Sequence, residues 1–347
     1  MAVTPPAVIR KFQRELLAWY DTHARDLPWR QSADPYHIWI SEIMLQQTRV
    51  AAVLGYYARF LTLFPSVAAL ARANEGEVLA AWSGLGYYRR AKLMHKAAKV
   101  VVLDHHGVIP RTAEQLRKLP GIGEYTSSAI ASIAFGEPVA VVDGNVERVL
   151  LRVFPDDQKP PASAAQSKWL RHRAANVLDA QRPGDFNQAM MELGATVCLP
   201  QRPLCLQCPV QQFCPTRGEH QVPEPKKMRS RLIAYALLRR HRAGSMQVML
   251  EQRPPSASLM PGMWELPEVA MIESDQERVE LTLRHAITIT NYRVRVLRFA
   301  EQEANLRFPT GQNLRQWTRS SELNTLPLTG LARKVLQRLQ IMTKEVR

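Results

Sequence analysis

The sequence lacks the features of a membrane or secreted protein. No apolar run reaches the ~18 residues that a membrane-spanning helix needs. Residues 1–6 do not begin the charged and then apolar pattern of a signal peptide. Cysteine is scarce, with only four residues in 347, all between positions 198 and 214, whereas a disulfide framework spreads its cysteines over a small secreted domain. We therefore expect a cytoplasmic protein without a membrane partner, in which the four cysteines form a metal site.

Acidic residues are outnumbered, because 31 Asp and Glu face 46 Lys and Arg, which gives a formal net charge of +15. Such an excess can serve solubility alone, or it can attract a polyanion, since counterion release drives binding to phosphates. Charge by itself does not distinguish DNA from RNA. The length exceeds that of one ordinary core and indicates two or three domains.

The chain changes character near residue 230. Residues 7 to 215 have helical periodicity without strand alternation, and helices are expected at 38–45, 53–63, 78–82, 91–103 and 126–135. The polar, basic and proline-bearing stretch from Pro215 to Ser230 indicates a linker. Beyond it we expect an α+β domain, with strands at 232–238, 246–251 and 292–299, a turn at 241–244, and helices at 276–285 and 331–339.

The string LPGIG at residues 119–123 lies between two helical stretches. Gly121 and Gly123 let the backbone turn tightly and approach a phosphate, and the following helix then points its free N–H groups at that phosphate. An ordinary turn between helices would also use glycine. The preceding Leu-Pro and the net charge favour a helix-hairpin-helix element that holds the DNA backbone without reading its sequence.

Two carboxylates, Glu42 and Asp143, lie in sequence contexts that indicate a specific structural or catalytic role. Glu42 interrupts an apolar helix, so burial should raise its pKa and keep it protonated near neutrality, as a general acid requires. The alternative is a buried glutamate paired with an arginine such as Arg30. Asp143 follows the apolar Val141-Val142 and precedes a helix, where an aspartate is most often an N-cap.

The cysteines Cys198, Cys205, Cys208 and Cys214 have the spacing C-x6-C-x2-C-x5-C. Four thiolates can hold a tetrahedral zinc ion or an iron–sulfur cluster, and the chemistry of the ligands leaves both open.

Four further strings carry a family resemblance: LPWR at 27–30, IWISEIMLQQT at 38–48, GLGYYRRA at 84–91 and FNQAMM at 186–191. Together with LPGIG, VVDGNV at 141–146 and the cysteine spacing, the chain resembles the MutY family of adenine DNA glycosylases in the helix-hairpin-helix, endonuclease III superfamily. The resemblance covers residues 7–215 almost continuously. It implies a mainly α N-terminal region, with a six-helix barrel and an iron–sulfur helical domain, followed by an α+β Nudix-like domain.

The resemblance also sets the expected domain boundaries. Residues 1–28 would form an N-terminal helix that packs with the iron–sulfur domain, 29–140 the six-helix barrel with the helix-hairpin-helix, and 141–215 the iron–sulfur domain. Residues 216–230 would be the linker and 231–347 the Nudix-like lesion-recognition domain. The cysteine spacing resembles that of the family's 4Fe–4S cluster, which this resemblance favours over zinc.

By this resemblance, the protein hydrolyses the N-glycosidic bond of adenine mispaired with 8-oxoguanine or guanine in base excision repair. Glu42 would protonate adenine N7 and later activate water, and Asp143 would stabilise the oxocarbenium-like sugar, by charge or a transient bond. Tyr125 and Asn145 would line the site. The substrate would be mispaired double-stranded DNA, bound by a monomer that associates with the nucleoid if the source is bacterial.

The resemblance assigns DNA contacts as well. Trp29, Arg30 and Gln188 match positions around the flipped adenine, and Arg202 lies in a loop that carries basic residues to the DNA backbone. The residues near the lesion would be Gln46, Gln47, Thr48, Leu85 and Tyr87. Helix packing is the alternative for Arg30, and a place in the core is the alternative for Tyr87.

Two departures from related patterns refine the expectation. Position 125, where the endonuclease III branch has a Schiff-base lysine, is a tyrosine, which predicts a monofunctional glycosylase with weak or no lyase action. In the C-terminal domain, residues 276–285 lack the glutamate array of a working Nudix hydrolase, so we expect binding rather than hydrolysis. The family's Phe-Ser-His stretch is replaced by Ile287-Thr288-Ile289, where Thr288 would supply the serine hydroxyl.

Two other functions stay open at this point. The chain could be a relative that removes thymine or oxidised pyrimidines, against which the Gln46-Gln47 pair and Tyr125 count. It could also be a cluster-bearing DNA-binding protein whose active site is no longer catalytic. The presence of both Glu42 and Asp143 counts against this alternative.

Overall fold

The structure is a computed structural model that describes residues 5–155, 164–218, 228–287, 289–303 and 313–343. The chain divides into two compact units. Unit 1 comprises Met1–Val50, Ser66–Ala68 and Lys96–Glu224, and unit 2 comprises Ala51–Pro65, Ala69–His95 and Pro225–Arg347. None of the described helices is long and apolar enough to span a membrane.

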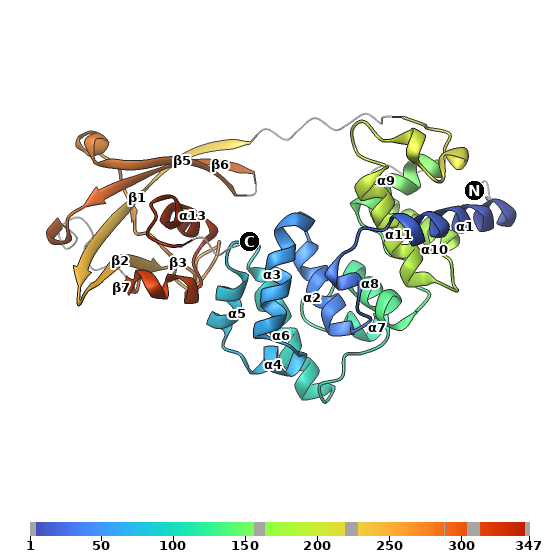
Figure 1. The fold of residues 1–347 in the computed structure, drawn as a ribbon, viewed down its shortest axis with the longest axis horizontal. Helices are drawn as coiled ribbons and strands as arrows, with labels where there is room; N and C mark the ends of the chain where they lie inside the picture. The colour runs from blue at the N-terminus through green and yellow to red at the C-terminus, as the bar shows by residue number, and fades with distance from the viewer. Residues whose placement is uncertain (1–4, 156–163, 219–227, 288, 304–312, 344–347) are drawn as a thin grey trace. The chain divides into compact units, whose positions relative to one another are not determined.

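Unit 1 is helical, and no strand occurs in its described residues (Figure 1). Its longer helices are α1 (Pro6–His23), α2 (Pro35–Leu45), α8 (Glu124–Phe135), α9 (Gly144–Val153), α10 (Ala164–Val177) and α11 (Pro183–Thr196). The shorter elements are η1 (Pro28–Arg30), α7 (Ala113–Leu116), η2 (Cys205–Gln207) and η3 (Gln211–Phe213). One core joins α1, α9, α10 and α11, with residues such as Phe12, Leu150 and Phe186 fully or almost fully buried.

Unit 2 combines helices with a mixed sheet. The helices are α3 (Val50–Leu63), α4 (Val67–Arg72), α5 (Glu75–Trp82), α6 (Arg89–Asp104) and α13 (Gly330–Arg338), of which α4 and α6 each continue into unit 1. The strands are β1 (Arg229–Arg242), β2 (Ser245–Gln252), β3 (Trp264–Glu265), β4 (Glu268–Val269), β5 (Val279–Ile287), β6 (Thr290–Phe299) and β7 (Arg315–Arg319). The short elements η4 (Glu273–Arg278), η5 (Glu301–Glu303) and η6 (Ser320–Thr325) connect them.

The main path of the sheet is β3-β2-β1-β6-β5, in which β1 and β6 run parallel and the other neighbours antiparallel. One face packs on α13 through a core that includes Tyr235, Val294 and Leu336 (Figure 1). The opposite face has a smaller core around Ala236 and Phe299. The expected fold class is therefore confirmed, with a helical N-terminal region followed by a mixed β-sheet region.

Within unit 2, the loop that follows α5 is hydrogen-bonded to the segment that leads into α13. The Ser83 hydroxyl donates to the Leu328 carbonyl over 2.7 Å, and the Tyr88 hydroxyl donates to the same oxygen over 3.2 Å. Arg333 of α13 donates from Nε to the Ser83 hydroxyl over 3.1 Å. A Cβ at Gly84 would overlap the Tyr56 hydroxyl, and its φ is +108°, so this loop requires glycine there.

Most elements expected from the sequence are present, but the expected helix at 276–285 is wrong. The chain makes the 3₁₀ turn η4 and then enters β5. Val279, Leu281 and Leu283 recur at every second position, the period of a strand, and a bulge between Val279 and Leu281 turns Val279 towards the opposite core. The expected turn at 241–244 is confirmed, and Ala243 and Gly244 both have positive φ there, as a tight hairpin requires.

The predicted domain boundaries remain a prediction, because the two compact units follow a different division of the chain. The predicted linker at 216–230 falls mostly on residues outside the described ranges.

Candidate active site

Glu42 lies in the middle of α2. The helix begins at Pro35, and the Asp34 carboxylate caps it by accepting a hydrogen bond from Tyr36 N over 2.7 Å. Apolar side chains cover α2 nearly all round, so the helix is buried, and Glu42 is only 6% exposed.

Tyr125 contacts this carboxylate. The helix-hairpin-helix turn places Gly121 at φ +77° and Gly123 at the N-cap of α8, so Tyr125 is the second residue of that helix. Its hydroxyl donates to Glu42 Oε2 over 2.7 Å and lies 3.4 Å from Met191 Sδ of α11. Tyr125 is therefore positioned by the same motif that is expected to hold the DNA backbone.

Glu42 has the pKa of a group poised near neutrality. Burial raises the pKa of its carboxyl from 4.5 to about 7, against the lowering effect of the Tyr125 hydrogen bond, and the Asp143 carboxylate raises it further. A carboxyl with this pKa can hold a proton at neutral pH and give it up during a reaction.

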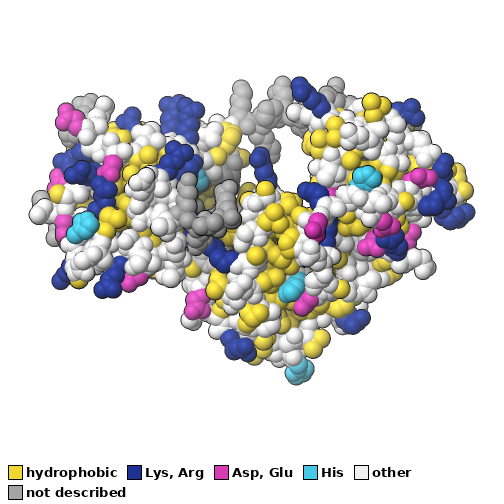
Figure 2. Space-filling view, viewed as in Figure 1, with side chains coloured by type: hydrophobic (Ala, Val, Ile, Leu, Met, Phe, Trp, Pro, Cys, Tyr) yellow, Lys and Arg dark blue, Asp and Glu magenta, His cyan; other side chains and the backbone are white. Residues whose placement is uncertain are grey.

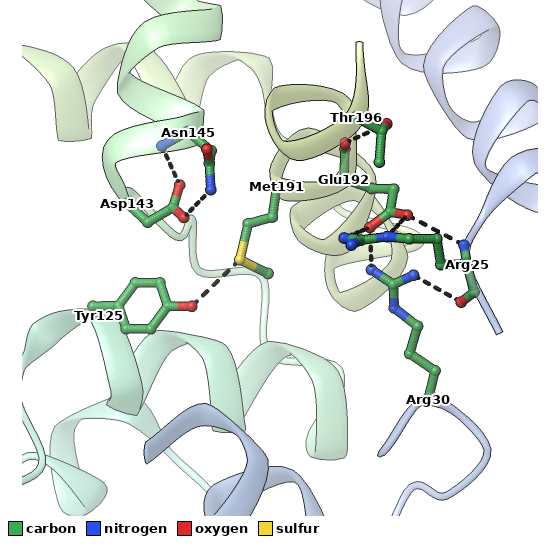
Figure 3. Close-up of polar contacts among 8 residues, drawn as sticks. All are labelled: Arg25, Arg30, Tyr125, Asp143, Asn145, Met191, Glu192 and Thr196. Carbon is green, nitrogen blue, oxygen red and sulfur yellow. Dashed lines mark hydrogen bonds and ion pairs between the residues drawn. The ribbon is translucent and has the colours of Figure 1, made fainter. Parts of the chain in front are cut away.

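Asp143 is the N-cap of α9, as its position in the sequence suggested. One oxygen, Oδ1, accepts from Asn145 N over 2.9 Å and Val146 N over 2.7 Å. The other oxygen, Oδ2, accepts from Asn145 Nδ2 over 3.0 Å (Figure 3). The cap thus fixes one oxygen of the carboxylate and orients the other, and a capping role does not exclude a catalytic one.

Arg148 connects this carboxylate to the cysteine region. It donates from NH2 to Asn145 Oδ1 over 2.9 Å and from Nε to the Cys198 carbonyl over 2.7 Å. Asn145 is therefore held between Arg148 and Asp143. Arg148 was not predicted as a site residue, because its contact with Cys198 joins positions 50 residues apart.

Asn187 positions the segment before Asp143 and was also missed as a functional residue, although it lies in one of the quoted family strings. Its buried amide donates to Ser132 Oγ and to the Val139 carbonyl, both over 2.9 Å, and its Oδ1 accepts from Val141 N over 3.0 Å. All three partners belong to α8 or to the segment that connects α8 to Asp143. A buried side chain with three satisfied hydrogen bonds fixes that path.

Arg30 does not pair with Glu42, so that alternative is wrong. Arg30 NH2 and Arg25 NH2 both donate to Glu192 Oε2 over 2.7 Å, and Arg25 Nε donates to Oε1 over 2.6 Å (Figure 3). Glu192 is 1% exposed. Burial raises the pKa of its carboxyl, but the two arginines outweigh that effect and lower the pKa to about 2. Arg30 thus joins η1 to α11, and its contact with adenine stays a prediction.

Replacing Glu192 by glutamine is expected to lower the free energy of unfolding by about 3–5 kcal/mol at neutral pH, because it leaves two guanidinium groups without their buried counter-charge. In the wild type this stability is present above pH ~4.5 and lost as the pH falls towards about 2. Urea denaturation at several pH values measures both effects. Glu15→Gln breaks an exposed pair with Arg14 and should cost no more than about 1 kcal/mol. Equal costs for the two variants would contradict the assignment.

The structure describes further expected DNA contacts in unit 1. Trp29 is buried in η1, and Gln188 is half-buried in α11. Gln46 follows α2 and donates from Nε2 to Thr126 Oγ1 over 3.1 Å. Gln47 has φ +55°, a left-handed conformation that is uncommon away from glycine and marks a special turn before Thr48.

Leu85 and Tyr87 belong to unit 2. Leu85 is buried, whereas Tyr87 is 48% exposed and has φ +49°, so Tyr87 is not the core aromatic that the alternative supposed. Arg90 lies over its ring at 5.3 Å. Thr288 lies outside the described residues, and its predicted role stays a prediction.

The four cysteines line one pocket of unit 1 with Arg152, Leu193 and Val197. Arg152 NH1 lies 3.4 Å from Cys198 Sγ and donates to the Leu199 carbonyl over 2.7 Å. Burial raises the pKa of the Cys208 thiol to about 11, and the three other cysteines raise it further, so the sulfur atoms are near neighbours. Among the described residues, no group of three or more Cys, His, Asp or Glu side chains is arranged to hold a metal ion. The loop between Cys198 and Cys205 carries Arg202 in a left-handed conformation, φ +49°.

Comparison with known proteins places the chain in a family. The model of the HhH-GPD superfamily base excision DNA repair proteins matches residues 40–172. A solved thermostable thymine-DNA glycosylase is 30% identical, with a TM-score of 0.56, and the match covers 61% of this chain and 97% of that one. The trapped endonuclease III–DNA intermediate shares the fold at 22% identity and a TM-score of 0.53, covering 62% and 98% of the two chains. The chain belongs to this superfamily of base excision repair proteins.

Within the superfamily, the relatives that the sequence matches include adenine DNA glycosylases. The human adenine DNA glycosylase is 41% identical over 78% of this chain, a share that extends beyond the helical region into the sheet region. The chain spans 59% of the length of that protein.

Proposed function

We propose that the protein is a monofunctional adenine DNA glycosylase, which hydrolyses the N-glycosidic bond of adenine opposite 8-oxoguanine or guanine in double-stranded DNA. The observation that carries this proposal is the pair of carboxylates: a buried Glu42 with a pKa of about 7, beside Asp143, whose oxygens accept hydrogen bonds in a helix cap. Two carboxylates with separate environments are what cleavage of a glycosidic bond requires.

In this mechanism Glu42 donates its proton to adenine N7, which makes the base a neutral leaving group. The electrons of the breaking C–N bond go to the base, and the sugar becomes an oxocarbenium-like cation. Asp143 stabilises that cation with its negative charge. Glu42, now a carboxylate, accepts a proton from the water that attacks the sugar carbon, and it is thereby ready for the next cycle.

Tyr125 serves this chemistry as a positioning residue, because its hydroxyl holds Glu42 Oε2. No lysine occurs between Pro120 and Val146, so this part of the chain offers no amine for a Schiff base. We therefore propose that strand scission follows only from alkaline treatment of the abasic site. The expected substrate would place the protein with chromosomal DNA, in a nucleus or a nucleoid.

The experiment that tests the function is single-turnover adenine release from 8-oxoguanine:A, G:A and T:G duplexes, with and without alkali. Release from 8-oxoguanine:A, with scission only after alkali, supports the proposal. Similar rates on 8-oxoguanine:A and G:A would mean that Ile287-Thr288-Ile289 does not discriminate the lesion. The likeness to the thymine-DNA glycosylase structure makes a thymine glycosylase the second candidate. Release of thymine from T:G, without release of adenine, would favour that candidate.

Replacing Tyr125 by phenylalanine should move the high-pH limb of the single-turnover rate to higher pH. The hydroxyl lowers the pKa of Glu42 by hydrogen bonding to its charged form, so its removal raises that pKa and keeps the acid protonated further into the alkaline range. Rates on 8-oxoguanine:A between pH 6 and pH 9 measure the limb. A limb that moves to lower pH would show that Tyr125 stabilises the protonated form of Glu42.

We propose that Cys198, Cys205, Cys208 and Cys214 hold a 4Fe–4S cluster. All four thiols line one pocket, which fits a common centre, and the resemblance of their spacing to the family's cluster motif favours the cluster over zinc. The cluster would cross-link the chain after α11. Purified protein should be brown and contain iron and acid-labile sulfide in equal amounts. One zinc per chain without sulfide would overturn the assignment.

A further inference from the structure

Unit 2 has a cavity of about 540 Å³ where the strands β1 and β6 end. Its lining includes Leu237, Arg239 and His241 of β1, Met246 of β2 and Arg298 of β6. This volume lies within the range of ligand-binding sites in proteins, which is roughly 300–1,000 Å³. None of these residues has a role in the proposed active site or in the cluster, so they are available for another function.

The register of the strands places these side chains on one side of the sheet. Leu237, Arg239 and His241 are alternate residues of β1 and project to the same side. Met246 is paired with His241 and projects to that side too. So does Arg298, which is aligned with Leu237. Because Leu237 belongs to the core that packs on α13 and Met246 contacts that core, the cavity has an apolar floor with cationic side chains beside it.

Positive charge exceeds negative charge around this cavity. Arg239 pairs with Glu280 over 2.9 Å, and Arg278, which also lines the cavity, pairs with Glu303 over 2.8 Å. Arg298 is exposed, and no ion pair among the described residues includes it. Figure 2 shows Lys and Arg side chains mixed with Asp and Glu side chains over unit 2, at the left of the view. Within the described chain, Arg298 is thus a cation of the cavity without a counter-charge.

The combination of floor and charges indicates the chemistry of a ligand. A guanidinium has five N–H donors, so Arg239 can keep Glu280 and bind a second carboxylate, while Arg298 binds another. The floor of Leu237 and Met246 adds affinity only for a ligand that brings an apolar group to it. Methionine adapts to apolar groups of different shape. An apolar side chain flanked by carboxylates matches both parts of the cavity, whereas backbone phosphates would use the arginines alone.

The cavity is remote from the predicted lesion contact on the same strand. β6 begins at Thr290, beside position 288, and ends at Phe299, which also lines the cavity. A strand rises about 3.3 Å per residue, so the two places are roughly 30 Å apart along β6. A protein segment bound in the cavity therefore need not compete with the lesion.

We propose that this cavity docks an acidic peptide segment of a partner protein. One apolar side chain of the segment would lie on Leu237 and Met246, and the flanking carboxylates would bind Arg298 and Arg239. The site goes beyond the proposed function, because it involves neither adenine nor the carboxylates Glu42 and Asp143.

The test is fluorescence anisotropy of a fluorescein-labelled peptide, Gly-Glu-Glu-Leu-Glu-Glu-Gly, with the full chain. Salt is held at 150 mM, where charges more than ~8 Å apart are largely screened. Arg298→Glu should weaken binding by about tenfold, because it places a like charge against the peptide carboxylates. The matched control is Arg293→Glu, an exposed arginine of the same strand that alternation places on the other side of the sheet, and it should bind like wild type. Thermal unfolding verifies that both variants are folded.

A second pair of changes tests the apolar floor. Met246→Ala should weaken binding of the leucine peptide by about three- to tenfold, but it should not affect a peptide with glycine in place of leucine. Equal effects on both peptides would show that the floor is not used and would contradict the proposal.

Three further results would overturn the inference. The first is no saturable binding of the leucine peptide, and the second is an equal loss of affinity in Arg293→Glu, which would show a general effect of charge. The third is a loss of binding to an undamaged DNA duplex by Arg298→Glu as large as its loss of peptide binding, which would make the cavity a DNA contact. Lack of adenine release by the wild type would reject the glycosylase and leave the peptide result unaffected.

Discussion

Replacing Glu42 by glutamine is expected to slow adenine release from 8-oxoguanine:A by about 10²- to 10⁴-fold, the range for loss of a positioned general acid. Glutamine keeps the shape of the glutamate side chain and can still accept the Tyr125 hydrogen bond, but it has no acidic proton to donate to adenine N7. Binding of the mispaired duplex should change little, because the substitution leaves the expected phosphate contacts in place. Single-turnover rates at saturating enzyme, beside anisotropy with the same duplex, measure both.

The pH dependence sharpens this result. The wild-type rate should fall as the pH rises above about 7, where Glu42 loses its proton, and the residual rate of the variant should not follow that limb. Glu137→Gln is the matched control, because Glu137 also lies in unit 1 and accepts a hydrogen bond from Ala113 N through a carboxylate oxygen that glutamine retains. A Glu42→Gln rate within threefold of wild type would remove Glu42 from the role of general acid.

Replacing Asp143 by asparagine is expected to reduce adenine release by about 10²- to 10³-fold, as for loss of one preorganised electrostatic group. The negative charge beside the developing sugar cation is lost, while the cap survives. Asparagine is as good an N-cap as aspartate, so its oxygen can continue to accept from Asn145 N and Val146 N. Thermal unfolding should therefore be almost unchanged, and duplex binding retained.

Asp143→Ala provides the comparison. It removes both the charge and the cap, so it should lose activity and also about 1 kcal/mol of stability. If Asp143→Asn lost binding and stability together with activity, the contribution of Asp143 would be structural. If Asp143→Asn stayed active, the charge would not be needed, and the two-carboxylate mechanism would fail.

The sequence predicted those parts of the site that depend on local pattern. Glu42 was found because apolar neighbours surround it on one short helix. The position of Asp143 before another helix indicated only an N-cap, and its catalytic role was predicted from the family resemblance. Arg148, Asn187 and Glu192 were not assigned roles, because each joins segments that are 46 to 167 residues apart, through Cys198, Val141 and Arg25, and no local pattern marks them. The same limit explains Arg30, which the sequence suggested as a partner of Glu42, because only the fold of the chain places Glu192 of α11 beside it.

In the sheet region, β1, β2 and β6 were predictable from apolar runs and alternation. The strand β5 was missed although its apolar residues alternate with the polar Glu280, Thr282 and Arg284, which is the period of a strand. Its alternation becomes decisive only when β6 is paired beside it, since a strand with one exposed face depends on its neighbour for stability.

The hydrogen bonds between the Ser83–Tyr88 loop and α13 join residues that are as much as 250 positions apart. A ribosome adds ~5–20 residues per second, so the Ser83 and Tyr88 hydroxyls emerge on the order of ten to fifty seconds before Leu328 and Arg333 exist. During that interval the loop and the buried surface of α5 have no partner from α13. The α5 helix and its loop are made early, but their hydrogen bonds to the segment around α13 can form only after that segment has been made. Nascent chains halted before α13 should remain in contact with chaperones through residues 51–95.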